Sequence, residues 1–325
     1  MTTARTVPVT TELDGDELDA ADAWRMARKI GLRRLLVDSA VRFRYGDGFT
    51  NSRALALQAA LAVVPFLLAL TGLAADIDQE RPSRVIASTI QGVSPGVGEQ
   101  DALASAVSGE DSSQDAGEVA LVLGLGFALL SLTTAMAQVE RGLNRIYGIR
   151  RDRPALAKYG RAALWTALLA VPLGLGFLLL VTGGAFGDAM VRSYGWSESA
   201  ERWWDVVRWP TGLALVVVAV AVMLDHAPRR RQPALSWLAL GSGIAVTLSM
   251  LAMALLALYV KVGNSFGAVY GPLGGVFALL IWALLSAISL FYGAAVCAQL
   301  EACRAGETVP AYDDPGRPHK TEVPG

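Results

Sequence analysis

The chain has 325 residues, of which 53% are hydrophobic and 18% are charged, and its formal net charge is −1. Ordinary soluble domains carry about a quarter charged residues, so this composition excludes a soluble globular domain and is typical of a helical membrane protein. Because the net charge is close to zero, the chain also lacks the overall basic field of a nucleic-acid-binding protein. We therefore expect membrane lipids, and no nucleic acid, among its partners.

The residues before the first apolar stretch fall into two parts. Residues 1–20 are polar and acidic, which predicts a disordered N-terminal tail. Residues 21–52 place apolar side chains among many arginines, and this pattern predicts a basic amphipathic helix on the cytoplasmic face of the membrane. The alternative is an ordinary helix that packs on the loops. Arginines interrupt every apolar stretch here, so we expect no signal peptide and an uncleaved first span.

Six apolar stretches are each long enough to cross a bilayer, which takes about 20 residues. They cover residues 54–75, 119–139, 162–186, 207–224, 234–260 and 273–299. The predicted fold class is therefore all-α, a polytopic membrane protein with six transmembrane helices within residues 53–303. Residues 304–325 contain four prolines and several charges, which predicts a disordered C-terminal tail.

Positive charge is concentrated in every second loop. The basic segments lie before the first span, between the second and third, and between the fourth and fifth, whereas the 76–118 loop is acidic. Cytoplasmic loops of membrane proteins carry an excess of lysine and arginine. Both termini are therefore expected in the cytoplasm, and the regular alternation supports the count of six spans.

A glycine repeat leads into the last span, where residues 260–277 read VKVGNSFGAVYGPLGGVF. The residues with expected helix-packing or hinge roles here are Gly263, Gly267, Gly271, Pro272 and Gly275. One interpretation is a tight packing seam, because small residues let membrane helices approach closely. The other is a discontinuous helix that lines a substrate path, as in transporters, since Asn264 and Tyr270 place polar groups within the break.

A second polar group ends the second span, where residues 135–148 read AMAQVERGLNRIYG. Gln138, Arg141 and Arg145 share one helical face, and Asn144 lies on another with Glu140. These side chains could form an ordinary cytoplasmic cap whose cations reach toward lipid phosphates. The alternative is a polar gate or a site for anionic headgroups that faces the bundle.

Three blocks of the chain resemble the YihY/BrkB family of bacterial inner-membrane proteins. They are FRYGDGFTNSRALALQAALAVVPFLLAL at 43–70, LNRIYG at 143–148 and GNSFGAVYGPLGGVFALLIW at 263–282, and the similarity covers roughly residues 40–303. The resemblance implies a multi-pass protein of the bacterial cytoplasmic membrane. Members of the family carry an old ribonuclease label or are described as envelope-integrity or virulence-associated proteins, and lipid transport has been suggested for relatives.

The chain departs from the family pattern at two places. The family has a tyrosine-rich stretch with serine before the proline of the first span, where this chain has QAALAVV before Pro65, a further candidate hinge. The family also has a glutamate after Gly-Ala in the last span, where this chain has Ala295. The nearest acid is Glu301, so any step that depends on the family's glutamate would need another group here.

The sequence lacks the motifs by which common classes of enzyme are recognised. The chain has two histidines, His226 and His319, and no histidine-aspartate cluster of the kind that holds catalytic metals. It has no Gly-rich phosphate loop and no Gly-x-Ser-x-Gly elbow. We therefore expect no enzymatic activity, no metal and no cofactor.

Two functional classes remain open. The first is a transporter or lipid translocase that contributes to envelope integrity, with a polar path through the spans. Candidate residues for that path are Gln58, Gln138, Arg141, Asn144, Arg145, Asn264 and Tyr270. The second is a structural or scaffolding protein, a closed bundle that acts through a second copy of itself or through an envelope protein. The two differ in whether these polar side chains converge on a cavity or scatter among packing contacts.

Overall fold

The structure is a computed structural model that describes residues 5–13, 18–76, 114–262 and 273–313. Its helices are α1 (Ala20–Ile30), α2 (Leu32–Tyr45), α3 (Gly48–Asp76), α6 (Gln114–Ile146), α7 (Ala155–Phe177), α8 (Gly183–Tyr194), α9 (Glu198–His226), α10 (Leu235–Val262) and α12 (Leu273–Arg304). A π-helical turn, η1 (Leu178–Thr182), joins α7 to α8, and two short strands, β1 (Arg5–Thr6) and β2 (Tyr312–Asp313), pair in antiparallel fashion.

The predicted all-α membrane fold is confirmed. Five helical segments are long and apolar enough to cross a membrane, and they lie in α6, α7 with η1, α9, α10 and α12. The predicted first span lies within α3, which is not one of these five. The count of six spans and the cytoplasmic placement of the termini therefore stay predictions.

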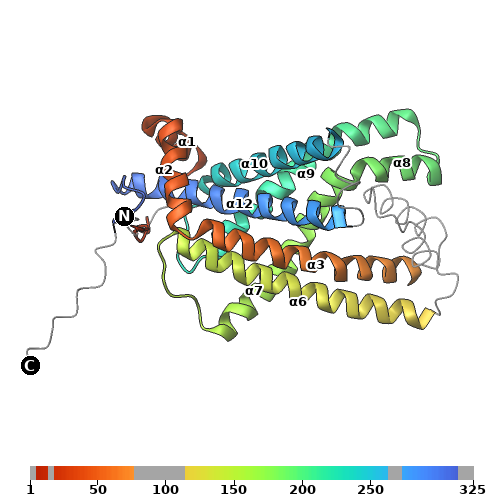
Figure 1. Ribbon diagram of the computed structural model, residues 1–325. Helices are drawn as coiled ribbons and strands as arrows, with labels where there is room; N and C mark the ends of the chain where they lie inside the picture. Colours follow the sequence, from red (N-terminus) through yellow and green to blue (C-terminus); the bar gives the residue numbers. More distant parts are fainter. Residues whose placement is uncertain (1–4, 14–17, 77–113, 263–272, 314–325) are drawn as a thin grey trace, which may run out of the picture.

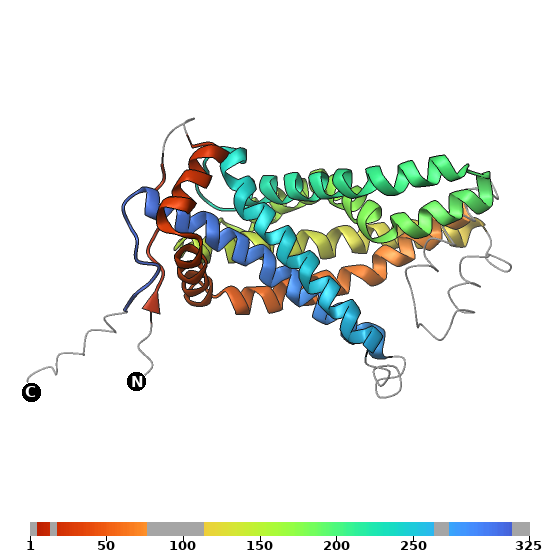
Figure 2. The same cartoon turned by 90° about the horizontal axis from the view of Figure 1, so that it is seen from above.

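The long helices run side by side along one axis, with α1 and α2 lying across one end (Figure 1). We call this end the termini end, because β1 and β2 pair there. Helix α3 packs along α6, α10 packs along α12, and α9 contacts both α7 and α10. The view from above shows α10 crossing obliquely over α12 (Figure 2).

The flanking segments are more ordered than predicted. The expected single helix over 21–52 is divided at Gly31, whose φ of 89° ends α1 before α2 begins. The prediction of disordered tails is wrong for residues 5–13 and 304–313, because β1 and β2 pair and Arg5 forms an ion pair of 2.9 Å with Asp313. We call residues 5–13 the terminal strap.

Buried apolar side chains are concentrated in the half of the bundle that includes the termini end. Leu143, Leu224, Trp237, Phe291 and Leu300 come from four different long helices and are all fully buried. Toward the opposite end, the described parts of the same helices are mostly exposed and apolar. The packed half therefore fixes the positions of the helices, while the opposite half presents apolar surface that suits acyl chains.

A close glycine contact does join α10 to α12, but at glycines other than the predicted ones. A Cβ on Gly293 would lie 2.4 Å from the Gly241 carbonyl oxygen and 2.8 Å from the Ala245 Cβ, so a larger residue would force the helices apart. At Gly275 a Cβ would meet no described heavy atom within 4 Å.

Of the remaining predicted hinge residues, the structure describes only Pro65. Helix α3 continues through Pro65. Gly263, Gly267, Gly271 and Pro272 lie outside the described residues.

Candidate functional site

The LNRIYG segment ends α6 at the centre of the termini end. Asn144 and Tyr147 are both fully or almost fully buried, and Gly148 adopts a φ of 79°, which terminates the helix. A Cβ at Gly148 would lie 2.4 Å from the Pro8 carbonyl oxygen, so only glycine lets the terminal strap pass this closely. The strap is also held by a backbone hydrogen bond of 3.0 Å from the Thr10 amide to the Tyr147 carbonyl.

A buried ion pair lies beneath the strap. Glu301, in the last turn of α12, has no exposed surface, and its carboxylate lies 2.7 Å from Nη2 of Arg230, whose side chain is 2% exposed. The Tyr147 hydroxyl donates to the other carboxylate oxygen at 3.3 Å, and the Arg230 guanidinium lies 4.6 Å from the centre of the Tyr147 ring. The α9–α10 loop, α6 and α12 are thereby joined through one carboxylate.

A second buried arginine lies beside this pair. Arg42 of α2 donates from Nε to the Ile146 carbonyl at 3.0 Å and from Nη1 to Gln299 at 3.3 Å. Its Nη2 donates to the Pro8 carbonyl at 3.2 Å and to the Thr10 hydroxyl of the strap. Burial lowers the pKa of Arg42 to about 10, so the guanidinium still carries its charge at neutral pH.

We call this group the buried ion cluster. Its members are Arg42, Tyr147, Arg230, Gln299 and Glu301. It contains two cations and one anion, and the hydrogen bonds of Arg42 to described residues all go to carbonyl, amide and hydroxyl oxygens. Buried charges cost several kcal/mol each in desolvation. The cluster therefore closes the termini end with a charged layer.

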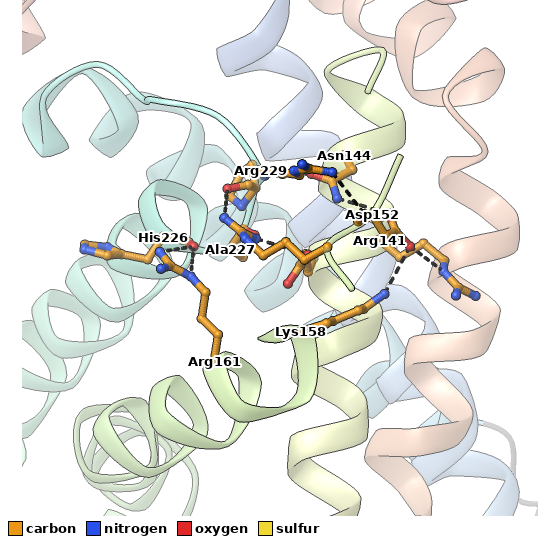
Figure 3. Close-up of polar contacts among 11 residues, drawn as sticks. Arg141, Asn144, Asp152, Lys158, Arg161, His226, Ala227 and Arg229 are labelled. Atoms are coloured by element: carbon orange, nitrogen blue, oxygen red, sulfur yellow. Dashed lines mark hydrogen bonds and ion pairs between the residues drawn. The ribbon is translucent and has the colours of Figure 1, made fainter. Parts of the chain in front are cut away.

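A second polar group, the Asp152 cluster, lies nearby on the loop that follows α6 (Figure 3). Asp152 accepts hydrogen bonds from Arg141 at 3.2 Å, Asn144 at 3.1 Å and Lys158 at 3.1 Å, and Asn144 accepts from the Arg229 amide at 2.8 Å. Burial by itself would raise the pKa of Asp152, but the hydrogen bonds from Asn144, Lys158 and Arg141 outweigh it and lower the pKa. The cluster fixes the α6–α7 loop against the α9–α10 loop.

The C-terminus of α9 is held by two further arginines. Arg153 donates to the Ala227 carbonyl at 2.9 Å and lies 3.1 Å from the buried Glu140 carboxylate. Arg161 donates to the His226 carbonyl at 3.0 Å (Figure 3). Cations suit this position, because carbonyl groups are unpaired at the end of a helix. Several arginines of the basic loops are therefore committed to contacts within the protein.

The structure brings two of the predicted path residues together. Arg141 and Asn144 meet at Asp152. Gln138 instead donates to Asn51 at 2.8 Å and links α6 to α3, and Arg145, in the last turn of α6, donates to the carbonyl of Arg150 in the loop that follows.

The other predicted path residues lie apart from these. Gln58 is half-buried on α3, and its Oε1 has no hydrogen-bond partner among the described residues. Asn264 and Tyr270 lie outside the described part of the chain.

The sequence did not predict the buried ion cluster, although it carries one signal of it. Glu301 is the only acidic residue in α12, a helix that is otherwise almost wholly apolar. An isolated acid in such a helix is expected to have a specific partner. The partner itself, Arg230, lies 71 positions away, and nothing in one sequence joins the two.

One small cavity lies within the packed half of the described residues. A cavity of about 10 Å³ lies among Glu140, Arg161, Trp165 and His226, which is room for about one water molecule. Within the same described ranges, no three His, Cys, Asp or Glu side chains are grouped so as to hold a metal ion.

Together, the fold and these clusters define a polytopic all-α membrane protein that is closed at one end by a buried charged layer. Residues 40–316 match the family model described as virulence factor BrkB. The chain belongs to this family, as its three sequence blocks predicted.

Curated relatives agree with this assignment. The chain is 25% identical over 266 residues to a protein of Bacillus subtilis (strain 168) described as ribonuclease-like, YfkH, covering 80% of this chain and 92% of that protein. It is 27% identical over 275 residues to a UPF0761 membrane protein of Chromohalobacter salexigens, covering 82% of this chain and 63% of the relative. It is 28% identical over 180 residues to a UPF0761 membrane protein of Laribacter hongkongensis, covering 54% of this chain and 40% of the relative. The chain thus spans less than two thirds of both UPF0761 relatives, and no solved structure matches it.

Proposed function

We propose that the protein is a transporter or lipid translocase of the bacterial cytoplasmic membrane, that it contributes to envelope integrity, and that its termini lie in the cytoplasm. The observation that carries this proposal is the buried ion cluster, which acts as a closed gate at the termini end. The basic loops around it support the cytoplasmic orientation.

A gate explains the cluster better than stability does. Buried ion pairs contribute little net stability, and apolar residues of similar volume often stabilise a fold as well or better. The cluster also joins α2, α6, α12, the α9–α10 loop and the terminal strap. Because these parts share one set of contacts, they would open or close together, as a two-state element requires.

The substrate class follows from the two halves of the bundle. The half away from the termini presents leucine, valine and phenylalanine, which suit acyl chains and not a polar solute. Opening the gate would expose Arg42 and Arg230, which suit a phosphate or another anionic headgroup. An anionic amphiphile such as a phospholipid satisfies both halves.

One observation favours the alternative, a scaffold without a substrate. Gln138, Arg141 and Asn144 bond to neighbouring protein groups, as expected of packing contacts. A scaffold would act through a second copy or an envelope protein. Under either proposal we expect no ribonuclease activity.

The test is the scrambling of fluorescent phospholipid in liposomes that contain the purified full chain. A translocase makes inner-leaflet label accessible to an external reductant faster than in protein-free liposomes. A helical, monodisperse sample that gives only the protein-free rate contradicts the proposal and favours the scaffold.

A further inference from the structure

An arginine lies within the apolar helix α9, far from the two clusters described above. Arg208 is 15% exposed, and its Nε lies 3.0 Å from Asp205, whose side chain is 54% exposed. Within the described residues, Asp205 is the one ion-pair partner of Arg208, and it approaches the Nε side. An arginine in a membrane-crossing segment is a candidate for function, because its desolvation is costly.

Helix α8 is shaped to receive this guanidinium. A Cβ on Gly183 would lie 3.1 Å from the Arg208 Cδ and 3.2 Å from its Nη1, and a Cβ on Gly184 would lie 3.6 Å from Nη1 and 3.7 Å from Nη2. The π-helical turn η1 ends immediately before these glycines, and such turns recur at functional sites. Trp204 fixes the local geometry by donating to the Gly183 carbonyl at 2.7 Å.

The depth of Arg208 matches the headgroups of the leaflet opposite the termini end. Arg208 precedes His226 by 18 residues on one helix, which corresponds to about 27 Å at 1.5 Å per residue. The hydrocarbon core of a bilayer is about 30 Å thick. Trp203 and Trp209 are exposed nearby, at 70% and 42%, as expected for an aromatic belt at the membrane interface.

We propose that Arg208, lying against Gly183 and Gly184, binds the phosphate of a phospholipid headgroup in the leaflet opposite the termini end. The terminal nitrogens of arginine form a fork that suits phosphate oxygens. Trp209, whose ring centre lies 5.4 Å from the guanidinium, borders the site. This site goes beyond the proposed translocation, because a protein can hold a phospholipid without moving it.

The experiment measures binding directly, so it can fail or succeed independently of transport. Phosphatidylglycerol with brominated acyl chains is titrated into the full chain in neutral detergent, and quenching of tryptophan emission reports binding. Arg208→Gln is expected to weaken binding about tenfold, since it removes charge-assisted hydrogen bonds. Arg202→Gln is the matched control, an exposed arginine on the same helix, and is expected to leave the affinity within about twofold.

Further measurements distinguish a lipid phosphate from free phosphate and show whether the variants remain folded. Brominated diacylglycerol, which has the same chains but no phosphate, should not distinguish wild type from Arg208→Gln. Gly184→Leu keeps the charge but displaces the guanidinium, and it should weaken binding while circular dichroism stays unchanged. Equal affinity in wild type, Arg208→Gln and Gly184→Leu would overturn the site. Competition by inorganic phosphate at concentrations equal to the lipid would overturn the assignment to a lipid.

Discussion

Glu301→Gln tests the buried ion cluster most simply, because it removes one charge and keeps the shape of the side chain. The wild-type carboxylate has no exposure and lies 2.7 Å from Arg230. Removing one partner of a buried pair costs about 3–5 kcal/mol. The amide oxygen can still accept from Tyr147, and the ring of Tyr147 still contacts Arg230, so we expect the lower end, about 3 kcal/mol.

The assay is thermal unfolding of the purified protein in detergent. At 2–4 °C per kcal/mol, the expected decrease in the unfolding temperature is roughly 6–12 °C. Asp313→Asn is the matched control, because its ion pair with Arg5 is exposed and is expected to contribute less than about 1 kcal/mol. Adding Arg230→Met to Glu301→Gln should recover much of the loss, because the unpaired cation is then removed.

The same substitution also tests the gate. A destabilised charged layer should open more often, so Glu301→Gln should scramble lipid faster than wild type. If Glu301→Gln unfolds at the same temperature as the Asp313→Asn control, the buried pair of Glu301 and Arg230 does not contribute the expected stability. A destabilised variant with an unchanged scrambling rate would keep the ion pair as a structural contact and remove its role as a gate.

Three further predictions concern packing, pH and a surface arginine. Gly293→Leu should prevent folding or lower stability by several kcal/mol, because its Cβ would enter α10, while Gly275→Leu should not; detergent-solubilised yield and unfolding temperature distinguish them. The lowered pKa of Asp152 means that its stabilisation is complete above about pH 5 and is lost as the pH falls through its folded pKa, so Asp152→Asn should flatten the acid limb of unfolding temperature against pH. Arg145→Ala should change stability by less than about 1 kcal/mol and leave scrambling unchanged, because the one described hydrogen bond of its side chain is on the exposed surface. A clear loss of scrambling would instead indicate that Arg145 contacts the substrate.

Much of the fold could be predicted from the sequence, because the length of an apolar stretch reports a membrane helix directly. Each predicted span lies in a helix of the structure, although the third also runs through η1 into α8. The structure of the two terminal segments was less predictable. Pro8 and Thr10 are held in place because their oxygens accept hydrogen bonds from Arg42 of α2. The composition of a short segment cannot reveal such a partner on another helix.

The glycine contact and the polar clusters were also hard to predict, because one sequence does not show which distant segments meet. A four-residue glycine repeat indicates where helices can approach, but the close contact between α10 and α12 in the described residues lies at Gly241 and Gly293. Arg141 and Asn144 were predicted on different faces of one helix, and both bond to Asp152, a residue that the sequence did not single out. The buried ion cluster escaped prediction because its residues come from four separate segments.

The gate is tested most directly by locking the terminal strap and measuring phospholipid scrambling. Thr6 and Tyr312 are opposite Cα partners in the antiparallel pair of β1 and β2, so cysteines at both positions should form a disulfide that pins the strap beside the buried ion cluster. The background carries Cys303→Ser, and Thr6→Cys alone is the control. We predict that oxidation stops scrambling in the double variant and that reduction restores it. Equal scrambling rates in the oxidised and reduced states would contradict the gate.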